Sequence, residues 1–457
     1  MASQENTAIA ATERGFRRFP NEMLRMIFSF AQDSSPADEK TPNKTIQNIR
    51  LACRDFCELS SEFLLPVVDI NVSSADLEYL EAISRHPTIG RGVKVVRLCV
   101  AFSSPILAAS IRAFREFCLA DATLPARNLS AEYLMKGWGI YKGMFKDQMA
   151  VLACGNFVTR FASAMAQMPS ALSLDLYTTM CQAMYYHHEV IDFAGLVNNR
   201  PGPWGRGAIC RRNHPWQHRN MPLQAIYVEL PAALHSAGVR LTRLSVDLVF
   251  GDWVLGDVLP DQLQRIVASV QSLETLYFTY HSPPIISRHD AEFQLESTRS
   301  FMLVTAFLNT KSLKTVIISH ENHRFHPLLY RTIGLWPLER VSNEFVTADC
   351  WSSVKKLSLY SMRFSIQDLQ LMTASMSKPL QLIEIDLNGC RISGTGWADF
   401  LDLMRGISRV VIFYRSEVHN EKPPDAFYGG GPTRSPAELF CMGKIENNPL
   451  RKYDDEV

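Results

Sequence analysis

The side chains most suited to recognition chemistry gather in residues 198–222, which hold five arginines, two tryptophans and no acidic residue. Glycine and proline are frequent there, which predicts a loop. Arginine forks bind carboxylates and phosphates, so the loop could contact an acidic or phosphorylated protein target. A solvated insertion, and nucleic-acid binding by arginine and aromatic stacking, remain alternatives. The candidate target-binding residues are Arg206, Arg211, Arg212 and Trp216.

The same segment contains Cys210, His214 and His218 at regular spacing. Structural zinc sites usually pair two closely spaced cysteines with two histidines, and the second cysteine is missing here. The sequence also has no G-x-S-x-G, P-loop or H-E-x-x-H motif, and no G-x-G-x-x-G after an expected strand. We therefore expect no metal, no cofactor and no catalytic activity.

Composition narrows the classes of partner. Of 457 residues, 47% are hydrophobic and 20% charged, as in ordinary globular proteins. The formal net charge of +1 provides no overall field for nucleic acid or an anionic membrane. The longest apolar runs are far shorter than the roughly 20 residues of a membrane span. The ten cysteines form no C-x-x-C pair, which favours reduced thiols and a cytoplasmic or nuclear location.

The elements that could present a binding surface begin with a helix expected from Pro20 or Asn21 onward. At 100° per residue, the polar side chains of residues 22–30 share an arc of about 60°. The apolar ones spread over about 200°, twice the stripe that a surface helix needs. They are Met23, Leu24, Met26, Ile27, Phe28 and Phe30. One half of this circumference can pack on its own domain, and the other half needs a second surface.

A second helix is expected after a polar loop that contains two prolines. Thr45 is a suitable N-cap, and apolar residues follow at helical spacing through Leu59. Ser60 or Ser61 could cap a short third helix that ends at Pro66. The alternation of apolar and polar residues over 68–72 then predicts a strand.

The two-part pattern F-P-N-E-M-L-R-M-I-F-S-F, then a loop, then I-R-L-A-C-R-D-F, resembles an F-box. The resemblance covers about residues 17–62, and the sequence that follows is similar to F-box proteins of filamentous fungi. Phe19 stands where the family usually has leucine, and the loop is longer than usual. An F-box docks on the Skp-type adaptor of cullin–RING ubiquitin ligases.

The resemblance, carried over position by position, implies a set of adaptor-facing residues. The alternative for each of them is a place in the internal core of the helical unit. The candidates are Phe19, Pro20, Leu24, Ile27, Phe28, Ile49, Cys53 and Phe56.

A short apolar cassette, L-x-x-L-x-L with aliphatic substitutions, recurs along the rest of the chain. Its first residues are Val93, Leu241, Leu273, Leu313, Val354, Leu382 and Ile407, with looser matches at Ala171 and Leu223. Helical patterns separate several of the cassettes, as in residues 261–270 and 397–404. Strands that alternate with helices predict an α/β array whose units stack to bury their faces. Residues 382–401 resemble a cysteine-type leucine-rich repeat, while a generic α/β domain is the alternative.

We therefore expect an α/β protein, with a small helical F-box followed by an irregular leucine-rich-repeat-like solenoid. The expected parts are a flexible N-terminus (1–16), the F-box (17–62), a linker with irregular repeats and an insertion near 198–222 (63–240), a repeat array (241–415) and a flexible tail (416–457). The resemblance implies a substrate adaptor that joins a Skp-type adaptor, and through it a cullin, to an unknown protein target. We expect no contact with nucleic acid or membrane. A cullin-independent scaffold and, less favoured, an enzyme within 63–415 are the alternatives.

Overall fold

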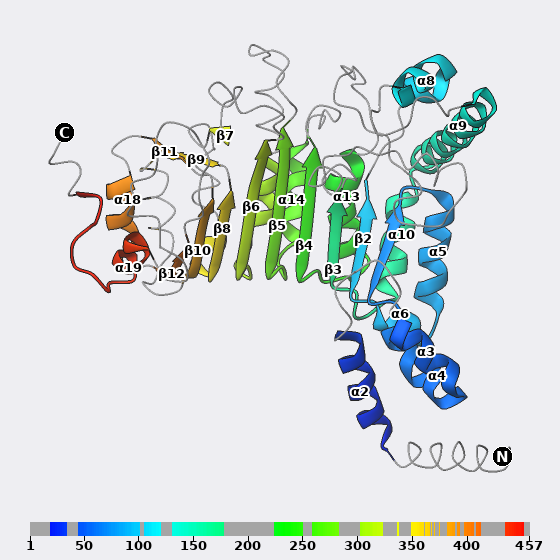
Figure 1. The fold of residues 1–457 in the computed structure, drawn as a ribbon, viewed down its shortest axis with the longest axis horizontal. Coiled ribbons are helices and arrows are strands. Elements are labelled where there is room, and N and C mark those ends of the chain that lie inside the picture. Colours follow the sequence, from blue (N-terminus) through cyan, green and yellow to red (C-terminus); the bar gives the residue numbers. More distant parts are fainter. Residues whose placement is uncertain are drawn as a thin grey trace.

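The apolar cassettes assemble into one nine-stranded parallel sheet, in the order β1-β2-β3-β4-β5-β6-β8-β10-β12 (Figure 1). The computed structural model describes residues 19–33, 44–100, 105–119, 130–177, 224–249, 258–282, 302–322, 336–337, 349–360, 362–365, 382–388, 391–393, 397–405, 408–412 and 435–451, with the single positions 367, 370 and 374. The strands of the large sheet are β1 (Val67–Asn71), β2 (Val95–Cys99), β3 (Ser173–Tyr177), β4 (Arg243–Val249), β5 (Thr275–Ser282), β6 (Thr315–Asn322), β8 (Lys356–Tyr360), β10 (Leu382–Asn388) and β12 (Ser408–Ile412). A second sheet contains β7 (Trp336–Pro337), β9 (Met362–Ser365) and β11 (Arg391–Ser393).

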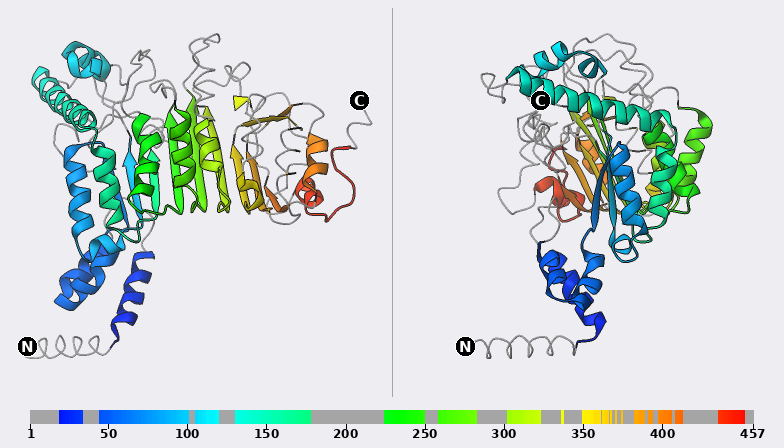
Figure 2. Two further views of the ribbon diagram at one scale, coloured as in Figure 1. Left: turned by 180° about the vertical axis from the view of Figure 1, so that it is seen from behind. Right: turned by 90° about the vertical axis from the view of Figure 1, so that its right-hand side faces the viewer.

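Helices cover one face of the large sheet (Figure 2). Four of them, α5 (Ser74–Arg85), α10 (Phe157–Ala166), α13 (Gln224–Ser236) and α14 (Pro260–Ser269), contact one another in sequence order. The main core lies between these helices and the strands, because alternate strand residues such as Leu174 and Leu176 are fully buried against them. The other described helical segments are α2 (Asn21–Asp33), α3 (Lys44–Ala52), α4 (Arg54–Ser60), η1 (Ser61–Phe63), α6 (Ile89–Gly92), α7 (Pro105–Ala109), α8 (Ile111–Leu119), α9 (Ala131–Ala153), η5 (Asp349–Ser352), α18 (Trp397–Met404) and α19 (Pro436–Cys441).

The expected α/β class is confirmed, and all but one of the cassettes lie in strands of the large sheet. The exception is the loose match at Leu223, since residues 224–236 form helix α13. Its buried side chains Ile226, Leu230 and Leu234 are four residues apart, which is helical spacing. A boundary between two regions was expected at residue 240. The large sheet continues across this position, because Ser173 of β3 pairs with Arg243 of β4.

The long apolar stretch before β3 forms two helices, α9 and α10. Helix α9 ends at Ala153 and α10 begins at Phe157, with Gly155 between them at a φ of +65° that favours glycine. In the described part of the chain no single helix is long and apolar enough to span a membrane. The helical segments Leu134–Ala153 and Phe157–Ala166 are long and apolar enough only when they are taken together, and an 80° bend separates them.

Part of the C-terminal region expected to be flexible packs on the main core. Residues 435–451 contain α19, whose N-terminus has a capping box in which Ser435 and Glu438 bond each other's backbone amides. Phe440 and Cys441 of this helix are buried in the main core cluster. Burial raises the pKa of the Cys441 thiol to about 12, which fits a packing role. The expectation of a flexible tail is therefore wrong for 435–451.

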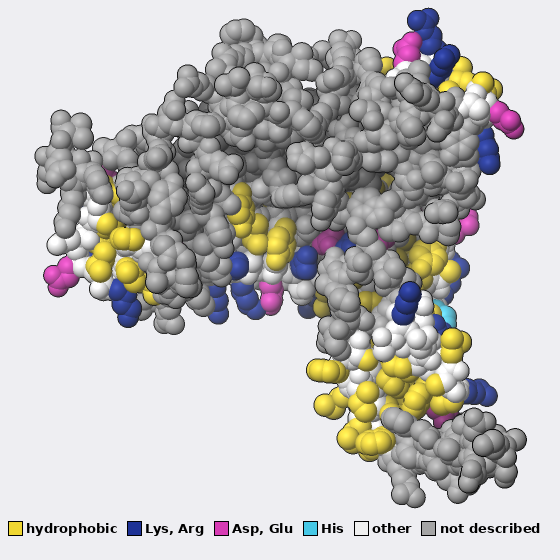
Figure 3. All heavy atoms as spheres, in the orientation of Figure 1, with side chains coloured by type: hydrophobic (Ala, Val, Ile, Leu, Met, Phe, Trp, Pro, Cys, Tyr) yellow, Lys and Arg dark blue, Asp and Glu magenta, His cyan; other side chains and the backbone are white. Residues whose placement is uncertain are grey.

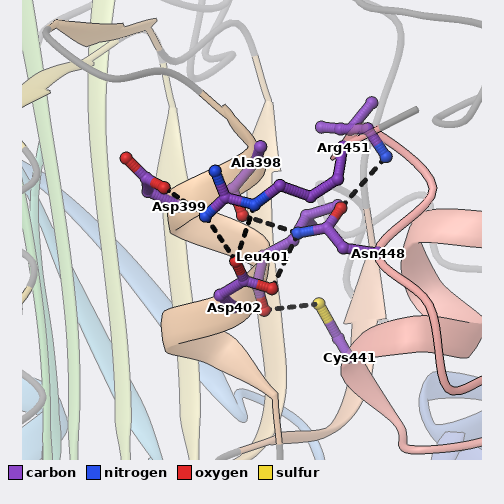
Figure 4. Close-up of polar contacts among 8 residues, drawn as sticks. Ala398, Asp399, Leu401, Asp402, Cys441, Asn448 and Arg451 are labelled. Atoms are coloured by element: carbon purple, nitrogen blue, oxygen red, sulfur yellow. Dashed lines mark hydrogen bonds and ion pairs between the residues drawn. The ribbon is translucent and has the colours of Figure 1, made fainter. Parts of the chain in front are cut away.

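A polar network fastens this segment to α18 (Figure 4). Asn448, which is buried, donates from Nδ2 to the Ala398 carbonyl at 2.7 Å and to Asp402 Oδ1 at 2.8 Å. Its Oδ1 accepts from the Leu450 amide at 3.0 Å. The Arg451 guanidinium lies 2.7 Å from Asp402 Oδ2 and 2.5 Å from an oxygen of Asp399.

Replacing Asn448 with alanine should destabilise the C-terminal end of the sheet by about 1–3 kcal/mol, because buried groups lose their hydrogen-bond partners. Thermal unfolding and hydrogen exchange of α18 measure the effect. Arg451→Ala is the matched control, since its ion pairs are solvent-exposed and their loss should matter less. Equal stability losses in the two variants would contradict a structural role for Asn448.

The N-terminal helices form a small unit below the first strands of the sheet, with many hydrophobic side chains on its surface (Figure 3). The unit, described at residues 19–33 and 44–65, meets the sheet domain where η1 packs on α6. A Cβ at Gly92 of α6 would lie 1.6 Å from the Glu62 carbonyl oxygen, so only glycine permits this approach of the two backbones. The Pro66 carbonyl accepts hydrogen bonds from the Lys94 and Val95 amides at 2.9 and 3.1 Å. Strand pairing in the sheet therefore begins directly after the contact of η1 with α6, which we call the joint.

Candidate docking surface

Helix α2 begins after Pro20, whose carbonyl accepts the Leu24 amide at 3.2 Å. One side of the helix closes the small core of the unit with two side chains, Leu24 and Phe28, which are 5% and 3% exposed. They pack with Ile46 of α3, which is fully buried. The Phe28 ring also makes edge contacts with Phe56 at 5.5 Å and Phe63 at 6.5 Å between centroids. Three helical elements are thereby held around one aromatic side chain.

The opposite side of α2 is apolar and exposed. We name it the α2 face and define it as Met23, Met26, Ile27 and Phe30, which are 46%, 72%, 45% and 76% exposed. Their spacing of three, four and seven residues places them on one side of a helix. Phe19, just before the helix, is 41% exposed, and Leu51 on α3 is 85% exposed.

Exposed apolar residues are concentrated in this unit. Six of the twelve large hydrophobic residues that are exposed in the described segments lie between residues 19 and 51. Scattered apolar residues are normal on protein surfaces, but a contiguous group marks an interaction site. Figure 3 shows the concentration of hydrophobic side chains on the helical unit, while the lower edge of the sheet is mainly basic. The α2 face is therefore the best candidate for a docking surface.

Polar contacts fix α2 on its neighbours without covering the α2 face. The Arg25 guanidinium lies 3.1 Å from Glu62 Oε1, and Gln32 Nε2 donates to the Phe63 carbonyl at 2.8 Å. Both contacts join α2 to η1, which in turn contacts α6 of the sheet domain. The α2 face is thus held in a defined orientation relative to the sheet.

Three of the eight residues expected to face an adaptor are on the surface. Phe19, Pro20 and Ile27 are exposed, and Ile27 lies on the α2 face. The division of the α2 circumference into a packed half and an uncovered half is also as the sequence indicates.

Two of the eight expectations need correction. Leu24 and Phe28 are not available to a partner, because both side chains are buried in the core of the helical unit. The physical reason is their spacing of four residues, which places them together on the side of α2 that meets Ile46. The internal-core alternative therefore applies to both of them.

The remaining three residues, Ile49, Cys53 and Phe56, are half-buried. Cys53 separates α3 from α4 in an extended conformation, and its Sγ accepts the Phe56 amide at 3.5 Å as an N-cap. Ile49 and Phe56 pack against the core of the unit. The second expected helix is therefore two helices, and these three residues act mainly inside the unit.

Four surface residues were absent from the expected set, namely Met23, Met26, Phe30 and Leu51. The sequence carried a signal for the first three, since all lie on the wide apolar arc of residues 22–30. The expected set follows the family motif, whereas the apolar arc also includes these positions. Nothing in the local pattern distinguishes Leu51.

The possible target-binding residues Arg206, Arg211, Arg212 and Trp216 lie outside the described residues, as do Cys210, His214 and His218. Within the described segments, no group of three or more histidine, cysteine, aspartate or glutamate side chains could hold a metal ion. Comparison with family models and with curated proteins finds no match to this chain.

Proposed function

We propose that this protein is the substrate-recognition adaptor of a Skp–cullin–F-box ubiquitin ligase. The helical unit docks the Skp-type adaptor through the α2 face, and the sheet domain binds a protein target. The observation that carries the proposal is that α2 has two apolar sides. Leu24 and Phe28 pack in the core of the unit, while Met26, Ile27 and Phe30 are exposed.

Two features of the unit support this function. Its sequence resembles an F-box over residues 17–62, and its three consecutive helices α2, α3 and α4 pack around a shared core. Covering the α2 face removes apolar area from water, which contributes about 25 cal/mol per Å² to association. A partner with an apolar groove is therefore favoured over a charged one.

The sheet domain supports the second half of the proposal. Its strands pair in sequence order and its helices lie on one face, an arrangement similar to a leucine-rich-repeat solenoid. We propose that the array presents a protein target while the helical unit holds the ligase. The contribution is then positional, because target lysines meet the charged ubiquitin-conjugating enzyme at high effective concentration.

Co-purification with a Skp-type adaptor tests the proposal. The double variant Ile27→Glu and Phe30→Glu places charges on the α2 face and should weaken adaptor binding at least about a hundredfold, as expected for two central interface residues. Circular dichroism should stay native, because both side chains are exposed.

The matched control is Ile106→Glu with Met135→Glu, which changes two comparably exposed apolar residues of α7 and α9. This variant should bind the adaptor like the wild type. Failure of the wild-type chain to bind, or unchanged binding by the α2-face variant, would reject the proposal. Recovery of the adaptor without any cullin would instead favour a cullin-independent scaffold.

A further inference from the structure

Arg50, in the last turn of α3, has a buried side-chain nitrogen that bonds nothing in the described part of the chain. Its Nε is shielded from solvent and donates no hydrogen bond, while the residue as a whole is half-buried. The other two described arginines of the helical unit are ion-paired, Arg25 with Glu62 at 3.1 Å and Arg54 with Glu58 at 3.2 Å. Arg50 therefore differs from them in having a guanidinium that no carboxylate of the described residues neutralises.

A buried donor of this kind is unfavourable in the isolated protein. Buried polar groups in native proteins are nearly always hydrogen-bonded, because a donor withdrawn from water loses free energy unless an acceptor replaces the water. Since no hydrogen bond fixes the Arg50 Nε, the guanidinium can turn outward without breaking a bond at this atom. An acceptor that arrives from outside would therefore relieve an unfavourable interaction that the free chain carries.

The position of Arg50 on α3 places it next to the docking surface. Ile46, four residues earlier on the same side of α3, is fully buried and packs with Leu24 and Phe28 of α2. Leu51, which follows Arg50 directly, is 85% exposed. Because α3 packs on α2, a partner that covers the α2 face also meets α3 at the boundary between its buried and its exposed apolar residues.

Resting on the proposed function, we infer that Arg50 pairs with an aspartate or glutamate side chain of the docked adaptor. The planar guanidinium offers two parallel N–H groups that match the two oxygens of a carboxylate, and such charge-assisted hydrogen bonds are the strong ones. A phosphate-rich partner fits less well, because Arg25 and Arg54, the other described arginines of the unit, already have carboxylate partners. The α2 face then supplies apolar contact area, while Arg50 selects for a partner that presents an acid at this place.

Titration calorimetry of the full chain with a Skp-type adaptor tests the inference. Arg50→Met keeps an unbranched stem and a similar helix propensity but removes every donor. The dissociation constant should rise about tenfold, as expected for a lost charge-assisted hydrogen bond. The midpoint of thermal unfolding should not fall, since the variant removes a buried group that bonds nothing in the free chain. A residue with a merely structural role would instead lose stability.

Two further measurements separate charge from packing. Arg50→Lys restores the positive charge without the planar fork, so its affinity should lie between those of the wild type and Arg50→Met. Added salt should weaken adaptor binding by the wild type more than binding by Arg50→Met, because only the wild type forms the ion pair. The matched control is Arg54→Met, which removes the same charge from a side chain that is 90% exposed and should bind like the wild type.

The possible outcomes distinguish the inference from the proposed function. Unchanged affinity of Arg50→Met, together with a loss in the variant Ile27→Glu and Phe30→Glu, would overturn the inference and leave the proposed function standing. An equal loss in Arg54→Met would indicate a general attraction of charge, and a lower unfolding midpoint of Arg50→Met would indicate a structural role, so either result also overturns the inference. If the wild-type chain does not bind the adaptor, the proposed function fails and the inference fails with it.

Discussion

Phe28→Ala should destabilise the helical unit by about 3–5 kcal/mol, the usual cost of removing a buried phenylalanine. The Phe28 ring is 3% exposed and contacts Phe56 and Phe63 through its edges, so α2, α4 and η1 all lose packing at once. A unit this small has little other core to compensate. Hydrogen-exchange mass spectrometry should detect faster exchange in α2, α3 and α4, with the sheet domain unaffected.

The neighbouring substitution Ile27→Ala is the matched control. Ile27 is 45% exposed, and its truncation should change stability by less than about 0.5 kcal/mol. Under the proposed function the two variants differ again, since Ile27→Ala weakens adaptor binding in a folded unit whereas Phe28→Ala acts through unfolding. Similar exchange rates in the two variants would contradict the division of α2 into a packed side and a docking side.

Gly92→Ala should disrupt the joint between the helical unit and the sheet domain. The new Cβ would lie 1.6 Å from the Glu62 carbonyl oxygen, a backbone atom that no side-chain rotation can move. Either α6 or η1 must shift, and we expect a loss of about 3 kcal/mol, at the upper end for overpacked sites. Thermal unfolding measures the loss, and limited proteolysis between residues 60 and 95 reports on the opened joint.

Gly143→Ala in α9 is the control for this prediction. A Cβ at Gly143 meets nothing within 4 Å, so the alanine should stabilise the helix by about 0.5–1 kcal/mol through its higher helix propensity. A Gly92→Ala protein as stable as the wild type would show that the joint tolerates a different approach of α6 to η1.

The strands of the sheet could be predicted from sequence because each unit repeats the same local pattern. Val96 and Leu98, Leu244 and Val246 alternate with half-exposed residues, and this period of two survives the irregular spacing between units. The same pattern failed at Ile226 and Val228, where two apolar residues fit a strand cassette by chance. A test for buried residues at the spacing of Ile226, Leu230 and Leu234 identifies the helix.

The docking surface could be predicted only in outline. The width of the apolar arc on α2 indicates that some of its side chains stay uncovered, but the arc does not say which. That choice depends on where Ile46 and Phe63 lie in space, which is a tertiary property. The motif from the family therefore assigned Phe28 to the surface, although its contacts with Phe56 and Phe63 place it inside.

The ordered C-terminal segment was missed for a different reason. Glycines and prolines in residues 422–432 are typical of a tail, while Ser435-Pro436-Ala437-Glu438 carries a capping box that predicts a helix start. Asparagine does not indicate burial on its own, because it is mostly exposed in proteins. The roles of Cys441 and Asn448 become visible only once α18 lies beside them.

The order of the strands has a consequence for how the molecule responds to damage. Each strand of the large sheet from β1 to β12 hydrogen-bonds only to the strands that precede and follow it in the sheet, and that order follows the sequence. Cohesion therefore passes from neighbour to neighbour, as in a one-dimensional chain of coupled units. A substitution that unfolds a central strand would divide the sheet into two parts that each keep their own strand pairs. A substitution that unfolds β1 or β12 would remove only that one strand from the array.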